Sequence, residues 1–106
     1  MGTETGRADP QGALFFKLCS DHLSIEAIPR STTKIDLQRL KGRFISGHEL
    51  ILWTPHFVVL RNEEGHEITL RQDGRMIIRK TLSEQVAERT ANQVMSAVHD
   101  LVKSRL

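Results

Sequence analysis

The sequence predicts a small α+β domain. We expect an antiparallel sheet of four to five strands with a short helix and a long C-terminal helix packed on one face, in the order β-α-β-β-β-β-α. Two observations predict this class. Apolar and polar residues alternate through 49–80, as in strands, and apolar residues recur at spacings of three and four through 82–104, as in a helix. The 106 residues are the usual length of one domain.

The N-terminal residues 1–12 are polar and rich in glycine, so we expect a flexible tail followed by a single domain over 13–106. The tail lacks the apolar segment of a secretory signal. The apolar residues 14–16 begin either a short strand or a docking arm. The alternation over 23–28 predicts a half-buried strand, which Pro29 ends.

A short helix is predicted near 34–42. Thr33 followed by Asp36 is close to a capping box, and Gly42 is a candidate stop. The apolar face of this helix would comprise Ile35, Leu37, Leu40 and Phe44.

Four strands should follow, and Asp73-Gly74 is the strongest hairpin signal among them. A turn is expected at 62–65. The predicted strands are 49–53, 57–61, 67–71 and 75–79. The final helix is predicted over 82–104, with Thr81 and Glu84 forming a capping box at its start.

The Asp73-Gly74 turn also predicts which side chains share a face. If it is a two-residue loop, Leu70 pairs with Ile77 and both point toward the helices. The opposite face then carries apolar residues rimmed by arginine, which often marks a partner surface. The predicted partner-binding residues are Val58, Leu60, Met76, Ile78, Arg61, Arg71 and Arg79. The alternative is that residues 14–16 fold back over this face.

The chain has no pattern typical of a catalytic, cofactor or metal site, so we expect neither enzymatic activity nor a cofactor. The single cysteine, Cys19, cannot form an internal disulfide, which fits a reducing, cytoplasmic compartment. No apolar run approaches the ~20 residues of a membrane span, and we expect no membrane partner. Five histidines lack any ligand spacing: His22, His48, His56, His66 and His99.

Four segments resemble the small C-terminal accessory domain of ThiF/MoeB/HesA-type adenylyltransferases, the ubiquitin-activating-like enzymes. These segments are 35–40, 57–61, 65–70 and 73–78, and the resemblance spans about 24–95. It implies an accessory domain standing alone that contacts an activating enzyme or a sulfur-carrier protein. The adenylating domain and its zinc cysteines are absent from this sequence, so no catalytic residue is carried over. The order of elements also resembles one half of a TATA-binding-protein-type fold, which implies possible pairing of two copies.

Three hypotheses for function follow. The first is a protein-interaction module, working with a partner protein or as a homodimer. The second is nucleic-acid binding through the basic residues Arg61, Arg71, Arg75, Arg79 and Lys80. Against it, Glu63, Glu64, Glu67 and Asp73 lie among those residues, and the formal net charge of the chain is only +2. The third, ranked last, is a small enzyme with a site at an oligomer interface, and activity that is lost on changing Cys19 or His66 would support it.

Overall fold

The computed structural model of the protein describes residues 14–18 and 23–104. Eight strands and one α-helix are found in this part of the chain, together with two short 3-10 helices, η2 and η3. The strands are β2 (Leu14–Leu18), β3 (Ser24–Pro29), β4 (Lys34–Ile35), β5 (His48–Trp53), β6 (Phe57–Asn62), β7 (Glu67–Arg71), β8 (Met76–Arg79) and β9 (Val102–Ser104). The helices are η2 (Leu37–Leu40), α1 (Glu84–Ala97) and η3 (His99–Leu101).

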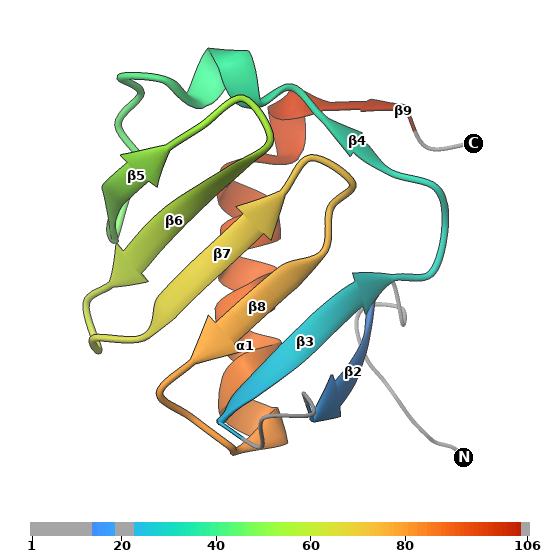
Figure 1. Cartoon of the computed structure of the whole chain (residues 1–106), viewed down its shortest axis with the longest axis vertical. Coiled ribbons are helices and arrows are strands. Elements are labelled where there is room, and N and C mark those ends of the chain that lie inside the picture. The colour runs from blue at the N-terminus through green and yellow to red at the C-terminus, as the bar shows by residue number, and fades with distance from the viewer. Residues whose placement is uncertain (1–13, 19–22, 105–106) are drawn as a thin grey trace.

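Six strands form one antiparallel sheet in the order β2-β3-β8-β7-β6-β5, and α1 runs behind it (Figure 1). Strands β4 and β9 form a separate two-stranded sheet. The predicted α+β class is therefore confirmed, with an antiparallel sheet and one long helix on a single face.

The core lies between the six-stranded sheet and α1. Ala87 and Ala91 are fully buried on the helix, and their small side chains let it approach the sheet closely. The strands contribute larger apolar side chains that no longer contact water. The fully buried strand residues of the central sheet are Ala27, Val58, Leu60, Ile68, Leu70, Met76 and Ile78.

The β7–β8 hairpin has a different register from the predicted one. Its loop has three residues, 72–74, because the Arg71 N–H donates to the Arg75 carbonyl at 2.9 Å. Gly74 takes a φ of +87°, which completes such a loop without strain. Leu70 therefore pairs with Met76 rather than Ile77. A shift of one residue moves every following side chain to the other face of the sheet.

Gly74 is also constrained by its neighbours. A Cβ at this position would lie 2.9 Å from Thr33 Cγ2 and 3.0 Å from Pro29 Cγ. Gly65, in the β6–β7 turn, has a similar φ of +88° but nothing within 4 Å of such a Cβ. The β7–β8 turn therefore packs against 29–33, whereas the β6–β7 turn is open.

The short helix predicted near 34–42 is wrong. Residues 34–35 are extended as β4 and pair with β9, and only Leu37–Leu40 turn, as the 3-10 helix η2. The backbone N–H groups explain this: that of Ile35 donates to the Gln72 carbonyl at 2.8 Å, and that of Asp36 to the Leu101 carbonyl at 2.9 Å. Long-range hydrogen bonds thus replace those of a local helix.

The final helix is shorter than predicted. Ser83, not Thr81, is the N-cap, and its side chain accepts from the Val86 N–H at 3.3 Å. The helix ends at Ala97 because Val98 leaves the helical region, with φ −113° and ψ 16°. The apolar periodicity continues beyond this point because Leu101 is buried from η3, and β9 then completes the pairing with β4.

Contacts of residues 37–43 connect η2 and the loop that follows it to β5 and to η3. The Trp53 Nε1–H donates to the Leu37 carbonyl at 2.7 Å, and Lys41 Nζ lies 4.9 Å from the centre of the Trp53 ring. Arg43 donates to both carboxylate oxygens of Asp100 at 3.0 and 3.2 Å. This hydrogen bonding holds the pKa of Asp100 below its ordinary value.

The apolar stretch after the N-terminal segment is a strand. Residues 14–18 pair with β3 at the edge of the six-stranded sheet, so they extend the sheet rather than fold over its face. The predicted flexible tail, 1–12, lies outside the described residues. None of the helices in the part of the chain that the structure describes is long and apolar enough to cross a membrane.

Candidate interaction surface

The side of the six-stranded sheet opposite α1 faces the viewer in Figure 1, and none of the labelled helices crosses it. We call this side the open face. It consists of the strand residues that alternate with the buried ones, so the register of the strands fixes its membership. These residues form rows that run across neighbouring strands.

The central row of the open face is mostly apolar. Leu52 on β5 is opposite Val59 on β6, which is opposite Thr69 on β7, which is opposite Ile77 on β8. The side chains of the last three are partly exposed, and Leu52 is 48% exposed. This apolar row lies at the middle of a surface that water reaches.

A row of alternating charge runs beside the apolar row. Its residues, in order from β5 to β8, are Glu49, Arg61, Glu67 and Arg79, and each is directly opposite the next. Arg61 lies 3.4 Å from a carboxylate oxygen of Glu49. We call this the charged row.

The other side of the apolar row carries Phe57 on β6, opposite Arg71 on β7. Arg71 is held by Asp73 at 2.9 Å, and Arg75 lies 3.3 Å from Glu26. A shallow hollow of about 500 Å³ lies at this end of the sheet. It is lined by His56, Phe57, Thr69, Arg71, Gln72 and Asp73. Most arginines of the open face therefore already contact a carboxylate.

The structure divides the predicted partner-binding residues into two groups. The arginines Arg61, Arg71 and Arg79 are exposed on the open face. The four apolar residues are on the opposite side, buried against the core with no exposed surface, so their predicted placement is wrong. They are Val58, Leu60, Met76 and Ile78.

The one-residue difference in the β7–β8 loop accounts for the error at Met76 and Ile78. Val58 and Leu60 were placed on the wrong face of β6 independently of this loop, since they lie opposite Leu70 and Ile68 of β7. With the observed register, the apolar residues of the central row are Leu52, Val59 and Ile77, and none of them was among the predicted partner-binding residues. Gln72-Asp73-Gly74 also fits a three-residue loop that ends in glycine, and that loop is the alternative that places Ile77 on the open face.

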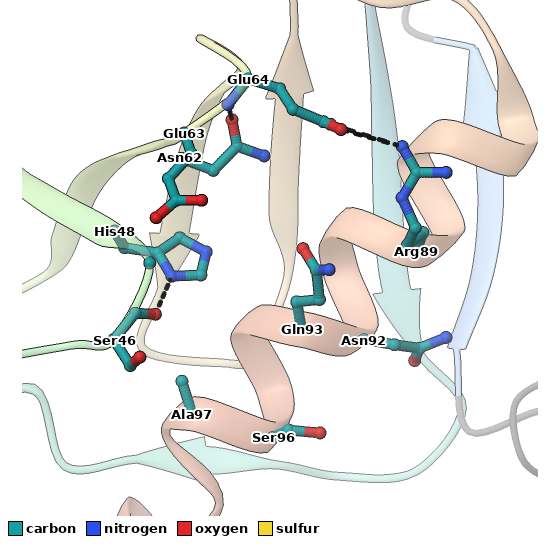
Figure 2. A pocket seen from close by; sticks show the side chains of 11 residues that line it. Ser46, His48, Asn62, Glu63, Glu64, Arg89, Asn92, Gln93, Ser96 and Ala97 are labelled. Carbon is teal, nitrogen blue, oxygen red and sulfur yellow. Dashed lines mark hydrogen bonds and ion pairs between the residues drawn. The ribbon is translucent and has the colours of Figure 1, made fainter.

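A second concave region lies on the helix side of the molecule. It is an open groove of about 770 Å³ between α1 and two turns, 46–48 and 62–64 (Figure 2). In it, Arg89 of α1 lies 3.4 Å from Glu64. The Asn62 side-chain oxygen accepts from the backbone N–H groups of Glu64 and His66, at 3.1 and 2.9 Å. Several polar groups of this groove thus stabilise its own turns.

The groove contains no nucleophile paired with a base among the described residues. The ring of His48 contacts Ser46 through its Nδ1, which lies 2.9 Å from the Ser46 backbone carbonyl and not from its hydroxyl (Figure 2). The His48 Nε2 is buried without a hydrogen-bond partner among the described residues. Within those same residues, no three potential ligands cluster in a way that could hold a metal ion. Cys19 and His22 lie outside the described ranges.

Comparison of this chain with protein-family models, curated proteins and solved structures gives no match.

Proposed function

We propose that this chain is a non-catalytic protein-interaction module whose contact surface is the open face. The observation that carries the proposal is the apolar row of Leu52, Val59, Thr69 and Ile77 at the centre of an exposed sheet face. An apolar centre surrounded by polar and charged groups is the usual anatomy of a protein–protein contact.

The charges around the apolar row favour a protein partner over a nucleic acid. Phosphate binding needs basic side chains that are free to neutralise phosphates. Here Arg61, Arg71 and Arg75 each lie within 3.4 Å of a carboxylate oxygen of this chain. A protein partner can accommodate such mixed charges in a polar rim, so the open face suits it better.

The resemblance to the accessory domain of ThiF/MoeB/HesA-type enzymes suggests where a partner is to be sought. An adenylyltransferase or a sulfur-carrier protein is the candidate that it implies. The single cysteine agrees with a cytoplasmic setting, where such partners would be met.

Co-purification from extract of the source cells tests the proposal. Three tagged proteins are compared at low salt, with and without nuclease: wild type, Val59→Asp and Gln93→Ala. Val59 is on the open face, and Gln93 is an exposed residue of the groove beside α1. We expect wild type and Gln93→Ala to retain the same proteins after nuclease, and Val59→Asp to lose them. Retention by all three would refute the proposal. The proposal would also be refuted if only nucleic acid were recovered and if ~0.5 M salt removed it, as counterion release predicts.

A further inference from the structure

The charged row of the open face is complementary to itself. From β5 to β8 its signs alternate: Glu49, Arg61, Glu67 and Arg79. Consider a twofold axis that lies between two such faces, parallel to the strands and midway between β6 and β7. This rotation places β6 opposite β7 of the second copy and β5 opposite β8. Each residue of the charged row then faces a residue of opposite sign.

We propose that the open face binds a second copy of this chain, face to face, in a symmetric dimer. The inference rests on the proposed function and names its partner. Arg61 faces Glu67 of the second copy, and Glu49 faces Arg79 of the second copy. Because a twofold contact uses the same patch on both subunits, each of these pairs occurs twice.

Two of the four charges have no ion-pair partner among residues 14–18 and 23–104. Glu67 and Arg79 are directly opposite in the β7–β8 register, yet neither forms an ion pair with another described residue. Arg61, by contrast, already lies 3.4 Å from Glu49. The face-to-face arrangement gives both unpaired groups a partner from the second copy.

The same rotation brings the apolar rows together. Leu52 comes opposite Ile77 of the second copy, and Val59 comes opposite Thr69 of the second copy. Apolar side chains at the centre of the contact exclude water from the flanking charge pairs, which strengthens them. Sheets packed face to face are rotated by about 30°, so the opposition is best at the central strands, β6 and β7.

A twofold axis perpendicular to the strands is less favourable. It would place the charged row over the row that contains Phe57, Arg71 and Arg75. Because residues 75, 77 and 79 follow one another on the open side of β8, Arg79 would then face Arg75 of the second copy. Like charges directly opposite each other weaken an interface. The axis parallel to the strands avoids this contact.

The size of the face sets the affinity range to be measured. Because the axis lies between β6 and β7, only the four strands β5 to β8 face each other; at ~4.8 Å spacing, with about five residues of ~3.4 Å each, they make a contact of roughly 19 by 17 Å. Its flat area of about 320 Å² is well below the ~800 Å² per partner of a standard interface. We therefore expect a dimer that dissociates on dilution, so self-association should be measured at protein concentrations from ~5 to ~500 µM.

Charge reversal tests the arrangement by sedimentation equilibrium. In Arg61→Glu, and equally in Glu67→Arg, two like charges meet across the contact, and we expect at least about tenfold weaker self-association. In a 1:1 mixture of these two variants, the introduced carboxylate faces the introduced guanidinium, and the remaining Glu67 faces the remaining Arg61. The mixture should therefore form a heterodimer about as stable as the wild-type dimer.

The matched control is Arg89→Glu, the same charge reversal on exposed α1 surface, which should leave the dimer unchanged. Circular dichroism checks that each variant is folded. Wild type that stays monomeric at ~500 µM, or a mixture that does not pair, would overturn the dimer. If partner capture that depends on Val59 persisted in that case, the proposed function would stand with a different protein as the occupant.

Discussion

Two adjacent valines of β6 give a direct test of which sheet face is the core. Val58→Asp and Val59→Asp are the same chemical change at neighbouring positions. Val58 has no exposed surface and lies on the α1 side, whereas Val59 is partly exposed on the open face. We expect Val58→Asp to unfold the domain and Val59→Asp to remain folded.

The magnitude at Val58 follows from burial. Removing a buried valine side chain loses about 1.5–3 kcal/mol. A carboxyl with an ordinary pKa of about 3.9 must also stay neutral in the core, which costs about 4 kcal/mol at pH 7. Together these approach the ~5–15 kcal/mol that stabilises a typical domain. At Val59 the cost is limited to roughly the ~1 kcal/mol span of strand propensities.

Urea unfolding followed by circular dichroism and by the fluorescence of Trp53, the single tryptophan, measures both changes. For a carboxyl whose pKa is raised in the folded state, the folded state binds more protons than the unfolded state between the two pKa values. Stability therefore falls as pH rises. The deficit of Val58→Asp should shrink by about 1.4 kcal/mol per pH unit from pH 7 toward pH 4. Equal midpoints for the two variants, or a larger loss at Val59, would refute the assigned register.

Three further predictions concern a turn, a hydrogen bond and an ion pair outside the central strands. Gly74→Ala should lower the free energy of unfolding by about 1–2 kcal/mol because of its positive φ, and by about 1–3 kcal/mol more because of overpacking. Gly65→Ala should lose only the part due to its positive φ. Equal thermal midpoints of the two variants would contradict the packing of the β7–β8 turn. Trp53→Phe leaves a backbone carbonyl of η2 without its donor and should cost about 1–3 kcal/mol in urea unfolding followed by circular dichroism; an unchanged midpoint would show that the bond contributes nothing. Because Arg43 lowers the pKa of Asp100, their pairing stabilises the fold above the ordinary pKa and is lost as pH falls through the lowered one, below about pH 4. Arg43→Gln should return that pKa toward its ordinary value in an NMR titration, and no change would contradict the assignment.

The sequence was sufficient for elements whose signals are local. The four strands between 49 and 79 and most of the final helix follow from periodicity within each segment, because alternate or every third or fourth residue must face the core. The register was not recoverable in this way. Asp73-Gly74 fits a two-residue loop and also the end of a three-residue loop, and the Arg71–Arg75 backbone hydrogen bond in the structure shows that the longer loop is formed.

Non-local pairing explains the remaining differences. Residues 34–35 carry a plausible helix signal, but their backbone N–H groups bond to Gln72 and Leu101, far away in the chain. The final helix keeps its apolar period through Leu101 although it ends at Ala97, because a 3-10 turn also buries that residue. The same holds for the predicted partner-binding residues. The arginines lie on the open face as expected, because charged side chains do not enter the core, whereas the four apolar residues were assigned to the wrong face of the sheet.

The order of strands in the sheet has a consequence for the route of folding. Strands β5 to β8 are joined by short turns, so they can assemble from local contacts. Strand β3 pairs with β8, for example Ser24 with Arg79, across more than half of the chain. Closing so large a loop is slow, so we expect the four-strand meander to form first and β3 to dock last. Until then β8 is an unpaired edge, open to association with other chains. Pulsed hydrogen exchange should accordingly protect the amides of β6 and β7 before that of Ile25.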